Sequence, residues 1–211
     1  MYVPAHFALS DMTALHAFMR RNVFAVLAAQ IGGRIQFAYA PLVLDTEPAP
    51  FGGVRFHLAR ANPLAEIEEG AELKLSIMGP HAYVSPDWHA APGQVPTWNY
   101  VAVEAAGRVR TLPDEGLKQL LFDLAAQEES ALAPKPAWTG ARLPPKRLDA
   151  LRNAIVGFRL PFDRLEGKAK LSQNRSSADR ESAIEGLEAR GDAASVAVAA
   201  AMRKALAEET E

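Results

Sequence analysis

The sequence predicts a mainly β protein with helical additions, folded as a Greek-key-like barrel that ends in a helical C-terminus. Strand-like runs joined by hairpin and turn signals, no strand–helix–strand rhythm and no GxGxxG motif support this prediction. The 211 residues, 49% of them hydrophobic and 23% charged, suit one globular domain. We expect a barrel with inserted helices over residues 1–165 and C-terminal helices over residues 176–211.

The N-terminal half is predicted to begin with a short amphipathic helix, for which Ser10 or Asp11 is a typical N-cap. Gly32-Gly33 separates two apolar runs and predicts an antiparallel hairpin. A short helix is expected to begin at Asn62-Pro63. The expected strands are residues 23–31, 34–44, 54–58 and 73–78.

The C-terminal half begins with a loop over residues 79–96, whose four prolines and two glycines favour a specialised, functional loop. Small residues at 105–107 indicate a bulge or a close backbone approach. The other expected elements are strands at 98–111 and 155–160, a helix from Asp114, an irregular stretch at 131–145, and two helices after Ser176 separated by Gly191 and Asp192.

Composition excludes several function classes. The formal charge of −2 gives no general attraction to nucleic acid or to an anionic membrane, so DNA binding needs a local basic patch and no membrane partner is expected. The chain has no cysteine, and its five histidines lack metal-ligand spacing, so no metal is expected. The N-terminus lacks a signal-peptide pattern, and we expect a cytoplasmic location.

Rings and small polar groups are concentrated in GPHAYVSPDWHAAPGQVPTWNY, residues 79–100. Aromatic faces beside amide and hydroxyl groups suit the binding of a flat heterocycle. Equally, the rings could be buried in the hydrophobic core and have only a structural role. The candidate residues here are His81, Tyr83, Ser85, Trp88, Thr97, Trp98, Asn99 and Tyr100.

Two further places could hold an anion. Arg60 and Asn62 flank a predicted helix start, where a phosphate would fit, and the alternative is an exposed arginine beside an ordinary cap. LEGKAKLSQNR, residues 165–175, is a basic and polar cluster that could pair with phosphate or flavin carbonyls, or could simply be a solvated loop. Its candidate residues are Lys168, Lys170, Ser172, Gln173, Asn174 and Arg175.

Taken together, MYVPAHF, HLARANP, GPHAYVSPDW, VPTWNY, LEGKAKLSQNR and ARGD resemble, in this order, the PaiB-like family of FMN-binding negative transcriptional regulators. The resemblance implies a split β-barrel homodimer with FMN at the subunit interface. It also implies that Arg60 and Asn62 contact the phosphate, that residues 81–85 and 97–100 line the ring or substrate pocket, and that residues 170–175 add a C-terminal contact.

Three functions follow as hypotheses. The first is an FMN-binding regulator, although the charge balance does not support DNA binding. The second is a flavin-dependent oxidoreductase, in which FMN would carry the electron chemistry. The third is a haem-binding sensor with His81 or His89 as axial ligand. No hydrolytic motif of the GxSxG kind and no P-loop is present.

Overall fold

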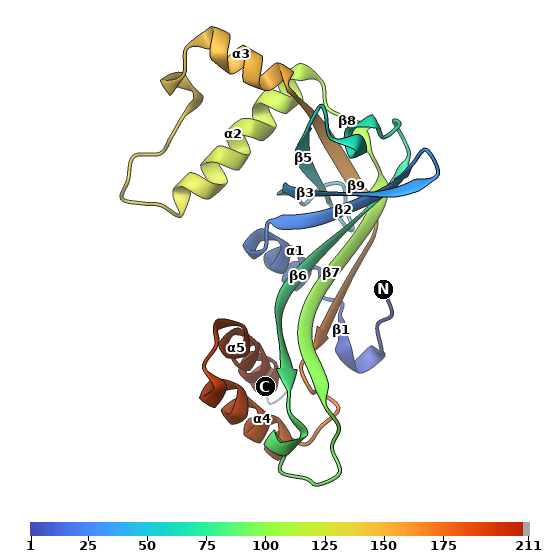
Figure 1. Cartoon of the computed structure of the whole chain (residues 1–211), viewed down its shortest axis with the longest axis vertical. Coiled ribbons are helices and arrows are strands. Elements are labelled where there is room, and N and C mark those ends of the chain that lie inside the picture. Colours follow the sequence, from blue (N-terminus) through green and yellow to red (C-terminus); the bar gives the residue numbers. More distant parts are fainter. Residues whose placement is uncertain (209–211) are drawn as a thin grey trace. The chain divides into compact units, whose positions relative to one another are not determined.

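The computed structural model describes residues 1–208, which form a nine-stranded, largely antiparallel sheet with helices (Figure 1). The strand order is β3-β2-β6-β7-β9-β5-β4, and β1 and β8 also pair with β9. The strands are β1 (Ala8–Leu9), β2 (Phe24–Ile31), β3 (Arg34–Pro41), β4 (Val43–Asp45), β5 (Gly53–Ala59), β6 (Glu72–Val84), β7 (Thr97–Arg108), β8 (Arg110–Thr111) and β9 (Ile155–Lys170). The α-helices are α1 (Met12–Arg21), α2 (Asp114–Ser130), α3 (Pro145–Asn153), α4 (Ser177–Arg190) and α5 (Ala193–Glu208).

The chain divides into two compact units. Unit 1 contains residues 1–15, 78–103 and 166 onward, and unit 2 contains residues 16–77 and 104–165. Each unit is therefore assembled from segments that lie far apart in the sequence.

In unit 2, the predicted hairpin is confirmed. Strands β2 and β3 pair antiparallel around Gly32 and Gly33, which both adopt positive φ angles of 55° and 77°. Strands β5 and β9 pair so that Phe56 stands opposite Phe158, with ring centroids 5.4 Å apart. Helix α2 buries its leucines against β4, and Arg55 on β5 binds carboxylates on both β4 and α2.

The close backbone approach predicted at residues 105–107 is also confirmed. A Cβ atom at Gly107 would lie 1.9 Å from the carbonyl oxygen of Pro161 on β9. Only glycine fits at this position because the two backbones would otherwise collide.

In unit 1, α4 and α5 pack against each other, and α4 also packs against the loop that follows β6. Helix α4 ends at Gly191 in the left-handed conformation, with φ of 74°, and Asp192 accepts the backbone N–H of Ser195 at 3.0 Å. Both predicted helix boundaries are thus confirmed. Trp88 lies against Gly186 of α4, where a Cβ atom would be 2.4 Å from the indole.

Some predicted strand ends were wrong, and one helix was not predicted. The strands expected at 34–44 and 98–111 are each divided in two, into β3 and β4 and into β7 and β8. Strand β6 does not end at Met78 but continues to Val84, because the alternation of buried residues resumes at Ala82 beyond the Gly79-Pro80 step. Strand β9 continues ten residues past Leu160 to Lys170. The sequence analysis also missed α3, which begins directly after Pro144.

The part of the chain described by the structure has no helix long and apolar enough to cross a membrane. The same residues contain no group of three or more histidines and carboxylates that could hold a metal ion.

Candidate functional site

Unit 1 carries an open aromatic face on β6 and β7. Trp98 is 55% exposed, and its ring centroid lies 6.4 Å from that of His81 and 6.3 Å from that of Tyr83. The alternation of β6 places Ala82 and Val84 in the core, so His81 and Tyr83 point away from it. We call His81, Tyr83 and Trp98 the ring face. It offers an accessible aromatic surface to a flat ligand.

Three cations at the end of β9 and just beyond it form a second feature, here called the cation cluster: Lys168, Lys170 and Arg175. The pKa of Lys170 is lowered, first by burial and then by repulsion from Lys168 and Arg175. The ammonium of Lys168 lies 5.3 Å from the ring centroid of Tyr100 and 5.7 Å from that of Tyr2. Tyr100 is two residues from Trp98 on β7, so the cation cluster adjoins the strand that carries the ring face.

The cation cluster has no ion-pair partner within residues 1–208, whereas several cations elsewhere have one. Arg55 binds two carboxylates at 2.8 Å, and Arg203 binds Glu188 at 2.8 Å. Uncompensated positive charge that is partly withdrawn from water favours an anion. The chemistry of this cluster therefore suits a phosphate or a carboxylate.

A buried polar contact fixes the chain behind the cation cluster. Asn99, which is fully buried on β7, donates from Nδ2 to the hydroxyl oxygen of Ser172 at 2.9 Å and also contacts the sulfur of Met202 at 3.3 Å. Ser172 is buried and adopts a φ of 66°, which is rare for a residue other than glycine. Asn99 and Ser172 thus hold the backbone between Lys170 and Arg175.

Gln173 adds to this support. Its Nε2 donates to the carbonyl oxygen of Ala169 at 2.6 Å, and its Oε1 accepts the N–H of Leu171 at 2.7 Å. Lys170 itself donates to the hydroxyl of Thr97 on β7. The segment from Lys170 to Gln173 is therefore tied down, while Asn174 and Arg175 are exposed.

The other predicted residues have local contacts of their own. The hydroxyl of Ser85 accepts the backbone N–H of Asp87 at 3.3 Å, as an N-cap. Nδ1 of His81 lies 3.1 Å from the carbonyl oxygen of Gly79. His89 is half-buried, and its Nδ1 lacks a hydrogen-bond partner in the described part of the chain.

Arg60 and Asn62 belong to unit 2, unlike all the other predicted site residues. The Arg60 guanidinium donates to the carbonyl oxygens of Asn153 at 3.1 Å and Ile155 at 3.0 Å. Asn62 caps a short 3₁₀ turn by accepting the N–H of Leu64 at 2.9 Å. Both side chains serve local structure, and Arg60 remains exposed.

Two features were missed by the sequence analysis. The Lys168 ammonium lies over the Tyr2 ring and donates a hydrogen bond to the Tyr2 carbonyl oxygen. The only indication of this role in the sequence was the place of Tyr2 in the MYVPAHF motif. His57 on β5 has an Nδ1 that is buried without a hydrogen-bond partner among residues 1–208, and burial lowers its pKa. Burial in unit 2 therefore favours the neutral form of the His57 imidazole.

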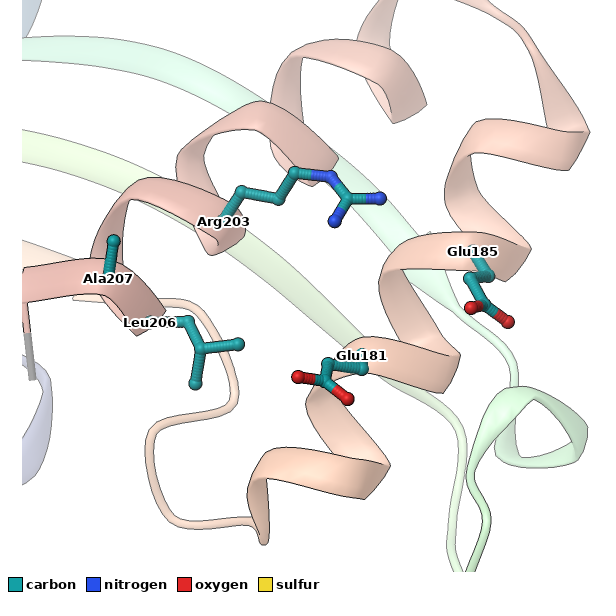
Figure 2. Close-up of a pocket in the computed structure, with 5 residues that line it drawn as sticks. All are labelled: Glu181, Glu185, Arg203, Leu206 and Ala207. Atoms are coloured by element: carbon teal, nitrogen blue, oxygen red, sulfur yellow. The ribbon is translucent and has the colours of Figure 1, made fainter. Parts of the chain in front are cut away.

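A groove of about 400 Å³ lies between α4 and α5 (Figure 2). Its lining residues are Glu181, Glu185, Arg203, Leu206 and Ala207. Figure 2 shows Glu181 and Glu185 on α4 and Arg203 and Leu206 on α5, with the Glu181 carboxylate directed toward the α5 side. The Arg203 guanidinium is bound to Glu188 and also interacts with the charges of Glu185 and Glu181, so three carboxylates surround one cation and the groove would repel an anionic cofactor. The ring face and the cation cluster are better suited to such a ligand.

Comparison with known proteins agrees with this chemistry. Residues 1–164 match the sequence model of the family described as "Putative FMN-binding domain". The chain is 29% identical over 189 residues to the Bacillus subtilis "Protease synthase and sporulation protein PAI 2", and the alignment covers 89% of each chain.

Two solved structures share the fold. The FAD and heme binding protein from Mycobacterium smegmatis matches with a TM-score of 0.59 and 16% identity, covering 88% of this chain and 80% of that one. The flavocytochrome Anf3 from Azotobacter vinelandii matches with a TM-score of 0.57 and 15% identity, covering 80% and 72%. The predicted split β-barrel is confirmed.

Proposed function

Because the chain belongs to the FMN-binding domain family whose sequence model spans residues 1–164, we propose that it is a PaiB-like protein that binds FMN through unit 1. The observation that carries this assignment is that the ring face and the uncompensated cation cluster occur in the same compact unit. FMN combines a flat aromatic ring system with a phosphate, so each part of the cofactor meets matching chemistry.

In this proposal, His81, Tyr83, Trp98 and Tyr100 contact the flavin ring, and Lys168, Lys170 and Arg175 contact the phosphate. Ser85, Thr97, Asn99, Ser172, Gln173 and Asn174 position these groups or line the pocket. A phosphate contact by Arg60 and Asn62, which belong to unit 2, stays a separate prediction. When bound, FMN supplies the electron or hydride chemistry, while the protein supplies binding and orientation.

The test is a fluorescence-quenching titration with FMN and, in parallel, with riboflavin, which lacks the phosphate. We expect FMN to bind and riboflavin to bind at least tenfold more weakly, because charge-assisted hydrogen bonds contribute about 1.5–3 kcal/mol. If riboflavin bound as tightly as FMN, the assignment of the cation cluster would be wrong. Absence of quenching by either flavin would overturn the function itself.

We further propose that the protein is a homodimer, supported by an apolar sheet face in unit 2. Phe24, Ile35, Phe37 and Tyr39 are 62–69% exposed, and the β2–β3 register places their side chains on one face of the hairpin. Together they expose roughly 500 Å² of apolar surface, a large part of the roughly 800 Å² that each partner buries in a standard interface.

Light scattering with size-exclusion chromatography tests this interface. Phe37→Asp should convert the dimer to a monomer, while Arg34→Asp at the exposed start of the same strand should leave the dimer intact. A monomeric wild-type protein would contradict the proposal.

The oxidoreductase, regulator and location hypotheses remain predictions. An oxidoreductase would need only the bound flavin and a reductant, and NADH oxidation in the presence of FMN would measure it. A transcriptional regulator would bind a specific operator, which a mobility-shift assay at low salt would measure. A cytoplasmic location could be tested by cell fractionation.

A further inference from the structure

Residues 131–153 of unit 2 form a surface segment in which no residue is buried. Figure 1 shows the chain leaving α2, passing through an open loop and returning through α3. Helix α3 has only nine residues, and seven of them are exposed. Helices this short are marginal in water unless an apolar side packs against something. This segment, here called the basic segment, is therefore able to gain contacts from a partner.

The charge of the basic segment is opposite to that of the whole chain. It contains five cations and one carboxylate, Asp149, which gives a formal charge of 5 − 1 = +4 in a chain of −2. Two of the cations are neutralised, since Lys135 binds Glu129 and Arg152 binds Asp114 at 3.1 Å. The other three, Arg142, Lys146 and Arg147, are exposed. Arg142 lies near enough to Glu129 to help lower the pKa of that carboxyl, while Lys146 and Arg147 have no ion-pair partner within residues 1–208.

Exposed apolar side chains accompany these cations. Leu132 is 53% exposed, Leu151 is 52% exposed and Trp138 is 39% exposed. A partner that satisfies the whole segment must therefore offer negative charge and an apolar region together. A nucleic-acid backbone offers phosphates but little apolar surface to the two leucines. An anionic bilayer offers both, through its headgroups and through the boundary of its acyl chains.

We propose that the basic segment is a docking surface for an anionic lipid membrane. Arg142, Lys146 and Arg147 meet the headgroups, and Leu132, Trp138 and Leu151 enter the interfacial region. The charge of the whole chain predicted no membrane partner, but this local concentration of cations reverses that expectation for one face of unit 2.

Co-sedimentation of the full chain with vesicles tests the proposal. Vesicles of phosphatidylcholine with phosphatidylserine should carry the protein down, and vesicles of phosphatidylcholine alone should not. Each cation near an anionic surface contributes roughly a fivefold factor, so K146Q/R147Q should weaken binding about 25-fold. The matched control R20Q/R21Q removes two exposed charges elsewhere in unit 2 and should bind like the wild type.

Three results would overturn the proposal. The first is a wild-type protein that stays in the supernatant with anionic vesicles at low salt. The second is an equal loss of binding in both double variants, which would indicate a general charge effect. The third is a shift of duplex DNA that depends on Lys146 and Arg147 without vesicle binding, which would identify nucleic acid as the partner. Circular dichroism and FMN titration of each variant verify that it is folded.

Discussion

Replacing Lys170 by methionine should affect ligand binding and stability in opposite directions. The Lys170 ammonium is half-buried, contacts the hydroxyl of Thr97, and lies near two other cations. Methionine keeps most of the side-chain length without the charge. We therefore expect Lys170→Met to bind FMN more weakly and, without ligand, to be more stable than the wild type.

The size of the first effect follows from the loss of one hydrogen bond to an ionised phosphate. Such bonds contribute about 1.5–3 kcal/mol, so the Kd for FMN should rise roughly 10- to 150-fold. The size of the second effect follows from removing a charge that burial disfavours and that Lys168 and Arg175 repel, less the lost contact with the Thr97 hydroxyl. In a partly exposed site this is on the order of 0.5–1 kcal/mol of unfolding free energy.

The pH dependence fixes the sign of the stability effect. The pKa of Lys170 is lower in the folded protein than in the unfolded chain, mainly because burial disfavours the ammonium. The destabilisation is therefore fully present below the folded-state pKa and is relieved as the pH rises through it toward the unfolded value. The stability advantage of Lys170→Met should accordingly shrink in alkaline buffer.

Urea unfolding without ligand and FMN fluorescence titration measure the two effects. Lys204→Met is the matched control, because Lys204 lies on α5 with a side chain that is 69% exposed. It should change neither quantity. Two results would refute this account of Lys170. One is that Lys170→Met binds FMN as tightly as the wild type, and the other is that it has a lower unfolding free energy than the wild type.

Three further substitutions test separate parts of the structure. Trp98→Ala should change thermal stability little because the ring is 55% exposed. It should weaken FMN binding by about 0.5–1.5 kcal/mol because the ring no longer stacks on the flavin. An unchanged Kd for FMN would show that Trp98 is not part of the site. Asn99→Ala should lower the unfolding free energy by about 1–3 kcal/mol, because the buried Ser172 hydroxyl loses its hydrogen-bond partner. An unchanged unfolding free energy in urea would contradict the role of Asn99 in holding this backbone segment. Gly107→Ala should largely abolish soluble folded protein because its Cβ would meet the Pro161 carbonyl oxygen, whereas Gly140→Ala, with 3.6 Å to its nearest neighbour, should express normally.

Much of the fold could be predicted because local signals agree with the final structure. The hairpin at Gly32-Gly33, the helix beginning at Asp114 and the left-handed cap at Gly191 each depend on a few neighbouring residues. The ends of β6 and β9 could not be predicted in this way. Gly79-Pro80 signals a turn, but pairing with neighbouring strands keeps the chain extended through it.

The candidate site was predictable in composition but not in arrangement. The rings and cations are visible in the sequence, since they lie in two short, unusual segments. Which of them turn inward depends on strand alternation and tertiary contacts. Asn99 is buried against Ser172 and Met202, while its neighbour Trp98 is exposed. The engagement of Arg60 by two backbone carbonyl groups likewise depends on residues about 95 positions away.

The visible absorbance spectrum of the purified protein, recorded after incubation with FMN and removal of free flavin by gel filtration, tests the central claim most directly. The FMN assignment predicts that the protein fraction keeps the two absorption bands of oxidised flavin, at close to one flavin per chain. A colourless protein fraction, with all of the FMN eluting as free flavin, would contradict it.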